Sequence, residues 1–295
     1  MKKIKNPLIR RIPKELIGDW KKYLVVFLFL VLTIGFVSGM YVANESMITS
    51  ANEGVTKYKQ EDGHFELKKQ ADATLLSAIE TGEKADFKAT KTTLYENFFR
   101  NEEEDYNNDG KKDGTIRVFA KTKDINLACM LQGSFPQKAD EIAIDRMHAD
   151  NVGIKVGDTV TVSGETYKVV GLLAYVNYST LHEKTTDLMF DALKFDVAMV
   201  TQDGFDRLHK SIHYTYAWKY ETEPADEAGE KTRSDNFMRA LLTQVVVADN
   251  ELEDYTPKYG NPAINFATDD MGSDKAMGGV LLDIPVSYTH LTLPT

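Results

Sequence analysis

The chain has little cysteine, little proline and no excess of positive charge. Its 295 residues include one Cys and 8 Pro, and 35 Lys+Arg stand against 45 Asp+Glu, for a net charge of −10. One cysteine excludes an intrachain disulfide framework and a multi-cysteine zinc site. We therefore expect Cys129 to be a buried, inert thiol. The acidic balance argues against a general nucleic-acid-binding protein, which needs a basic stripe.

What is present fits a folded chain of one large domain or two ordinary domains. At 42% hydrophobic and 27% charged residues, the chain is neither disordered nor collagen-like. Its length is enough for a substantial hydrophobic core. No sequence repeat of fixed period is present, which argues against a solenoid or propeller.

The charge is distributed unevenly around one long apolar run. Residues 1–22 hold eight Lys/Arg and two acidic residues, or +6, so the remaining residues carry −16. Residues 23–43 follow without a single charge. A helix of that length is about 30 Å long, which matches the hydrocarbon core of a bilayer. The basic residues precede the run, so the positive-inside rule predicts a cytoplasmic segment at 1–22 and an outer region from residue 44.

A cleaved signal peptide is the competing interpretation of this run. Signal peptides have an apolar region of about 7–15 residues and small residues before the cleavage site. The run here is longer, and the bulky Tyr41 lies two residues before Ala43, the best cleavage position. We therefore expect an uncleaved transmembrane helix. The preceding residues, from about Pro13, are either an amphipathic helix along the inner membrane surface or a plain basic flank.

The outer region predicts an α+β domain with a mixed or antiparallel sheet. Alternating and β-branched residues predict strands at 64–67, 115–122, 125–133, 141–145, 195–201 and 214–221, and a hairpin over 157–176. Helical patterns predict a continuation of the span to about Tyr58, helices at 71–80, from 146 to Gly153 and at 233–247, and a short helix over 202–212. The last of these helices would begin at Ser234 or Asp235 as N-cap.

Residues 133–171 carry a resemblance to a known family. The pattern includes the Val156, Gly157, Asp158 turn and the Val169, Val170, Gly171 run, and its other members are Gly133, Pro136, Glu141, Ile142, Ala149, Gly153, Val160, Val162 and Tyr167. In these residues, and in its basic N-terminus, single span and outer domain, the chain resembles the extracytoplasmic, MacB-like periplasmic core domain of FtsX/MacB-type ABC transporter permeases. The resemblance covers most of residues 10–284.

The resemblance implies a transport protein of the cell membrane that is not itself an enzyme. Such permeases bind no cofactor, and a separate cytoplasmic ABC ATPase binds and hydrolyses ATP. The chain agrees in having no G-x-x-x-x-G-K-[ST] phosphate-binding motif. Further implied partners are a second permease copy or homologue and membrane lipid. The implied role is export or extraction of a lipid, peptide or lipoprotein, or control of a cell-wall enzyme, and no catalytic residue is implied.

The sequence departs from the family pattern after the outer domain, which we assign to 44–275. The family has further spans there. Residues 276–284 are interpreted as the start of a second transmembrane helix. Residues 285–295 resemble a translated sequencing adapter, so we expect a C-terminally truncated fragment with a non-native tail.

One acidic loop has the spacing of a calcium-binding motif. Asp105, Asn107, Asp109 and Asp113 occupy positions 1, 3, 5 and 9 of an EF-hand-like loop, and the Lys111 carbonyl would be the position-7 ligand. Position 12 is Ile116 in place of the usual glutamate. The sequence predicts a Ca²⁺ site here, with a solvated acidic loop as the alternative.

Two other candidate sites are weaker. His209 and His213 are four residues apart, which would place them on one helix face as zinc ligands can lie, but no third ligand is evident and surface histidines are the better interpretation. His182 and Glu183 lack a second histidine at metal-ligand spacing. No G-x-S-x-G motif occurs, which argues against a membrane-anchored hydrolase. The main rival to a permease is a single-span, surface-anchored binding or sensor protein.

Overall fold

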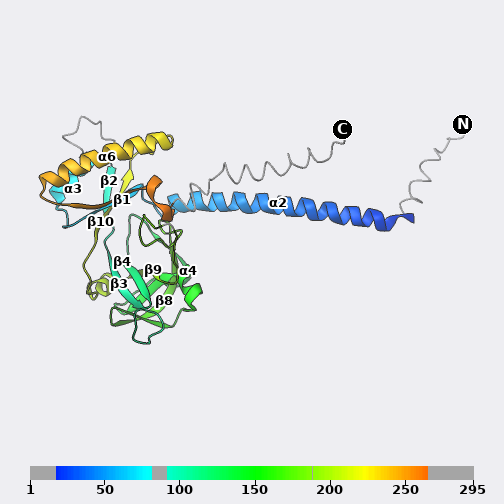
Figure 1. The fold of residues 1–295 in the computed structure, drawn as a ribbon, viewed down its shortest axis with the longest axis horizontal. Coiled ribbons are helices and arrows are strands. Elements are labelled where there is room, and N and C mark those ends of the chain that lie inside the picture. Colours follow the sequence, from blue (N-terminus) through cyan, green and yellow to red (C-terminus); the bar gives the residue numbers. More distant parts are fainter. Residues whose placement is uncertain (1–17, 82–91, 188, 265–295) are drawn as a thin grey trace. The chain divides into compact units, whose positions relative to one another are not determined.

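A computed structural model describes residues 18–81, 92–187 and 189–264. The chain forms two compact units that divide between Asn52 and Glu53. The first unit consists of most of helix α2, Trp20–Lys57 (Figure 1). Its stretch Trp20–Ala43 is long and apolar enough to cross a membrane. The side chains of this stretch are exposed, as expected for a helix without a polar face whose apolar surface meets lipid.

The second unit contains two sheets, and the smaller one has four antiparallel strands. Its order is β11–β1–β10–β2, and its strands are β1 (Gly63–Leu67), β2 (Thr92–Glu96), β10 (Tyr214–Tyr220) and β11 (Leu252–Pro257). Helices α3 (Ala73–Thr81) and α6 (Glu227–Val247) cover one face (Figure 1). Phe65, Tyr216 and Trp218 form the core there with Phe237 and Leu241. The short helix η1 (Lys258–Gly260) follows β11.

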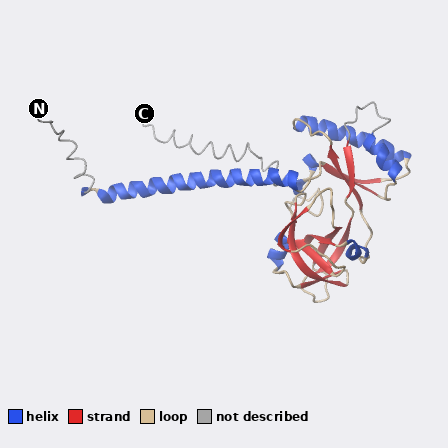
Figure 2. Cartoon of the chain, turned by 180° about the vertical axis from the view of Figure 1, so that it is seen from behind, coloured by secondary structure: helices blue, strands red, loops and turns tan. Residues whose placement is uncertain are grey.

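The larger sheet closes into a six-stranded barrel with one additional strand (Figure 2). Its order is β5–β8–β6–β9–β4–β3–β7, and β7 also pairs with β8. The strands are β3 (Phe99–Asp105), β4 (Gly114–Ala120), β5 (Ala128–Gly133), β6 (Glu141–Asp145), β7 (Thr159–Val162), β8 (Glu165–Tyr175) and β9 (Phe195–Val200). The pairs β4–β9 and β6–β8 are parallel and the others are antiparallel. The sheet is therefore mixed, as predicted.

Two short helices lie at opposite ends of the barrel. Helix α4 (Arg146–Val152) follows β6 directly, and α5 (Gln202–Asp206) follows β9. Because β6 and β9 are antiparallel, the helices that follow them lie at opposite ends. The barrel interior between them is mostly apolar, with buried Ile, Val, Leu and Tyr side chains from its strands. Successive strand residues point to opposite faces, so a second set, including Phe99, Phe119 and Phe195, packs on the outer face.

Most of the predicted elements are present. The hairpin over 157–176 is β7–β8, residues 141–145 are β6, and α4 ends at Gly153 in the left-handed conformation. The fold class, an N-terminal apolar helix with a mixed α and β domain, is confirmed. Residues 276–284 and 285–295, and residues 1–17 of the predicted cytoplasmic segment, lie outside the described part.

Four predictions need correction. Helix α6 begins at Glu227 with Asp226 as N-cap, six residues before the predicted start, because the Asp226 carboxylate accepts the Gly229 amide. Helix α5 ends at Asp206, six residues before the end of the short helix predicted over 202–212. Strands β2, β3 and β11 were not predicted. The Cys129 thiol is only half-buried, and the Tyr58 hydroxyl donates to its sulfur at 2.9 Å.

Candidate functional site

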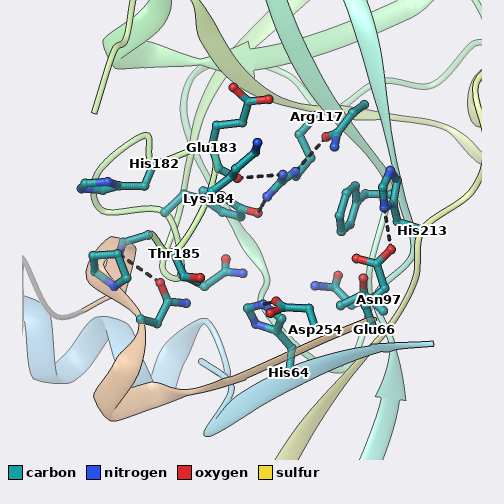
Figure 3. A pocket seen from close by; sticks show the side chains of 18 of the residues that line it. His64, Glu66, Asn97, Arg117, His182, Glu183, Lys184, Thr185, His213 and Asp254 are labelled. Carbon is teal, nitrogen blue, oxygen red and sulfur yellow. Dashed lines mark hydrogen bonds and ion pairs between the residues drawn. The ribbon is translucent and has the colours of Figure 1, made fainter. Parts of the chain in front are cut away.

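A cleft of about 390 Å³ lies between the four-stranded sheet and the outer face of the barrel (Figure 3). Strand β1 contributes His64 and Glu66. The intervening Phe65 and Leu67 are buried against the helices on the other face of that sheet, which is the period-2 pattern of a strand. The barrel contributes Arg117 from β4, and residues 182–186 form part of the rim. The cleft therefore contains side chains of both signs of charge.

Arg117 makes three hydrogen bonds and a ring contact in the cleft. Its guanidinium lies 4.4 Å from the centre of the Phe99 ring and donates to the Tyr178 hydroxyl at 2.7 Å, to Asn101 Oδ1 at 3.0 Å and to the Glu183 carbonyl at 3.0 Å. Figure 3 shows Arg117 directed towards Glu183. Burial raises the pKa of Tyr178, so this hydroxyl stays neutral as it accepts the hydrogen bond. Arg117 thus joins the barrel to the rim of the cleft.

Two histidines of the cleft are paired with carboxylates. His213 Nδ1 lies 2.6 Å from Glu66 Oε1, and the ring stacks on Phe99 with centroids 4.6 Å apart. His64 Nδ1 lies 2.6 Å from Glu61 Oε1. Burial disfavours the charged His64 ring, but the Glu61 carboxylate outweighs this and raises the pKa of His64 above 6.5. The cleft therefore gains a positive charge at His64 more readily than a free imidazole would.

His209 and His213, the two histidines four residues apart, do not lie on a common helix face. His209 follows the end of α5, is exposed and lies 4.0 Å from Glu165. His213 pairs with Glu66 in the cleft. The two do not share a helix face, because the helix has ended before either of them. His182 lines the cleft.

The predicted calcium-loop residues are brought together between β3 and β4. Asp105 accepts the Asp109 and Gly110 amides, and Asn107 Oδ1 also accepts the Asp109 amide. The Asp109 carboxylate accepts the Lys111 amide, and Asp113 accepts from the Tyr106 amide and the Asn107 side chain.

These hydrogen bonds hold the loop through its own side chains, as in Asx turns. The side chain of Ile116 at position 12 is fully buried in the barrel. Calcium binding by Asp105, Asn107, Asp109, Lys111 and Asp113 stays a prediction.

The sequence did not point to the cleft itself. Its residues come from segments up to about two hundred positions apart, from His64 to Ala263, and no local motif joins them. One signal was available: the alternation in 64–67 separates the polar His64 and Glu66 from the apolar Phe65 and Leu67. That pattern marks a strand with one polar face.

Comparisons with known proteins give only structural neighbours. No protein-family model and no curated protein matches the chain. The fold is similar to the extracellular domain of the noncanonic ABC-type transporter YknZ from Gram-positive bacteria, with 13% identity, a TM-score of 0.34, and coverage of 66% of this chain and 98% of that one. It is also similar to the periplasmic region of MacB from Actinobacillus actinomycetemcomitans, with 8% identity, a TM-score of 0.34, and coverage of 70% and 94%.

Proposed function

We propose that the chain is part of the permease of an ABC transporter, with residues 1–22 in the cytoplasm and the unit from Glu53 onward outside the cell membrane. The observation that carries the proposal is the order of three parts: a basic segment, the apolar stretch Trp20–Ala43 and a mixed α and β domain. The basic segment sets the orientation by the positive-inside rule. The pattern over residues 133–171 supplies the resemblance to this class.

In this proposal the chain hydrolyses no nucleotide. A separate cytoplasmic ATPase binds ATP, and its dimerisation moves the spans of two permease copies or homologues. The outer domains move with them and act on a lipid, a peptide or lipoprotein, or a cell-wall enzyme. The cleft around Arg117 lies between two sheets of one outer domain, a position in which a small change in the angle between the sheets would alter its width.

ATP hydrolysis by the isolated assembly tests the proposal. The gene is tagged at its 5′ end at its native locus, so that its whole natural product is expressed in its native cells. That product is isolated from solubilised membranes, and vanadate-sensitive ATP hydrolysis is measured. The control is the same chain without residues 1–43, checked for folding by thermal denaturation. The permease proposal predicts that hydrolysis co-purifies with the full chain and is absent from the control.

The same measurement distinguishes the permease proposal from its rival. A single-span binding or sensor protein predicts no co-purifying ATP hydrolysis from membranes that contain the folded full chain. That result would overturn the permease proposal.

A further inference from the structure

Three ionisable side chains meet inside the barrel at the end that α4 covers. Glu104 comes from the end of β3, Asp196 from the start of β9 and His148 from α4. All three are fully buried, and one potential ligand atom of each lies within 4.8 Å of the others. The surrounding interior is apolar, with Ile116, Val162 and other aliphatic side chains. Such a cluster is costly in an apolar core unless its charges are compensated.

The orientation of His148 leaves one ring nitrogen, Nε2, without a hydrogen bond within the described residues. Its Nδ1 lies 2.8 Å from the Ala192 carbonyl oxygen. A carbonyl oxygen only accepts hydrogen bonds, so Nδ1 carries the proton. Nε2 lies 3.4 Å from Glu104 Oε2, and no hydrogen bond satisfies it within the described residues. In neutral His148 the Nε2 lone pair therefore faces a carboxylate, and this repulsive arrangement is relieved either by a proton on Nε2 or by a cation between the two groups.

The carboxylates of Asp196 and Glu104 also have oxygen atoms without a hydrogen bond within the described residues. Asp196 Oδ1 accepts the Val197 amide at 2.7 Å and the Asp145 amide at 3.2 Å. Its Oδ2 has no hydrogen-bond partner in the described part of the chain, and the same holds for both oxygens of Glu104. The cluster thus offers one nitrogen and three oxygens without hydrogen bonds. His148 and Asp196 also hydrogen-bond to backbone atoms through their other ring nitrogen and carboxylate oxygen. Such outer hydrogen bonds commonly orient the ligands of metal sites.

We propose that Glu104, His148 and Asp196 bind a divalent transition-metal ion of the zinc type through Nε2 of His148, Oδ2 of Asp196 and the carboxylate of Glu104. Ligands at about 2.0–2.1 Å in a tetrahedron lie about 3.3 Å apart, close to the 3.4 Å between His148 Nε2 and Glu104 Oε2. A bidentate Glu104 completes four donor atoms. Mixed imidazole and carboxylate donors suit Zn²⁺ and other first-row ions better than Ca²⁺.

A divalent ion neutralises the charge of the cluster. Two ionised carboxylates and a neutral imidazole carry −2, which M²⁺ balances. The neighbouring Asp145 carboxylate does not belong to the ligand set, because it caps α4 by accepting the Met147 amide at 2.7 Å. The ion would be inaccessible to solvent, so its role is structural. It would fasten α4 to β3 and β9, which are adjacent to the same strand, β4, in the barrel.

Metal content and thermal stability of the full chain test the site. The chain is purified in detergent, stripped with chelator, incubated with Zn²⁺ and dialysed, and bound zinc is measured by mass spectrometry. The test variants Glu104→Gln and Asp196→Asn are isosteric, and Asp196→Asn keeps the Oδ1 acceptor. The matched control is His209→Asn, which changes an exposed histidine. The wild type and control should retain about one zinc per chain and gain several degrees in Tm with Zn²⁺. Both test variants should lose the bound zinc and the shift.

Cobalt gives a second readout on the wild-type chain alone, for the case in which a test variant does not fold. Co²⁺ in a tetrahedral nitrogen and oxygen site should give visible absorption that Zn²⁺ abolishes. Two results would overturn the proposal: a folded wild-type chain that retains no zinc and gives no cobalt spectrum, or folded variants that bind zinc as the wild type does. In either case protons, and not a metal ion, compensate the cluster.

Discussion

Gly133 lies against the backbone of Val170, so closely that a β-carbon at Gly133 would overlap the Val170 carbonyl oxygen. Gly133 also has a φ of +79°. It ends β5, where that strand pairs with β8 outside the closed barrel. Both requirements favour glycine, because any side chain would be strained by the backbone angle and would collide with the neighbouring strand.

We therefore expect Gly133→Ala to destabilise the chain by more than the backbone angle alone explains. Gly164→Ala is the matched control, because Gly164 has a φ of +87° with open space around it. Gly164→Ala should lower the free energy of unfolding by about 1 kcal/mol. Gly133→Ala should lower it by at least twice as much. Chemical denaturation of the full chain in detergent, followed by fluorescence, measures both. Equal losses for the two variants would show that the close approach does not matter.

Replacement of Arg117 should lower the free energy of unfolding. Arg117→Met removes three hydrogen bonds and the contact with Phe99, and we expect a loss of about 2 kcal/mol. Lys121→Met is the control, because exposed Lys121 contacts one ring, Phe135, at 4.7 Å. It should cost less than about 0.5 kcal/mol. The same denaturation measurement applies, and similar costs would mean that the hydrogen bonds of Arg117 add nothing to stability.

Protonation of His64 should stabilise the fold in acid. The pKa of His64 is raised in the folded chain by Glu61, against the effect of burial. A raised folded-state pKa means that the stabilisation is complete below the unfolded value of 6.5 and is lost as the pH rises through the folded value. The Tm difference between the wild type and His64→Gln should therefore narrow from pH 6 to pH 9. A constant difference across this range would contradict the role of Glu61.

Calcium, if bound by the loop after β3, should stabilise the chain at millimolar concentration. A site with a Kd of about 10⁻⁴–10⁻³ M would add about 1–2 kcal/mol to the free energy of unfolding in 5 mM Ca²⁺. Asp109→Asn should remove this effect, whereas Asp150→Asn, at an exposed position of α4, should leave it intact. Thermal denaturation with Ca²⁺ and with Mg²⁺ measures the shift. No shift with Ca²⁺ would identify the loop as an acidic turn held by its own hydrogen bonds.

The sequence predicted best those elements whose pattern is local. The hairpin over 157–176 has alternating valines around a turn, and α4 has a glycine at its end, so both were found within a residue or two. Strand β3 was missed because Glu102 and Glu104 point into the barrel interior, where an apolar residue is the rule. Its sequence therefore reads as a polar loop. Closure of the barrel was also not predictable, because it depends on pairs as distant as Thr115 and Phe195.

The candidate sites also differ in whether their residues are close together in the sequence. The calcium loop is one continuous segment, so its spacing was visible in the sequence. Glu104, His148 and Asp196 are separated by 44 and 48 positions and meet only because β3, α4 and β9 meet at one end of the barrel. The residues of the cleft are equally scattered. Sites of this kind follow from topology, which single-sequence patterns do not specify.

The side of the membrane on which each part lies is the most direct test of the account. In a Cys129→Ser background, Lys22→Cys and Lys112→Cys place single thiols at exposed positions before and after the uncharged run 23–43. Intact cells or spheroplasts are treated with a membrane-impermeant maleimide. The account predicts that the thiol at position 112 reacts at once and the thiol at position 22 only after permeabilisation. Protection at position 112, or release of the outer domain without residue 22, would contradict it.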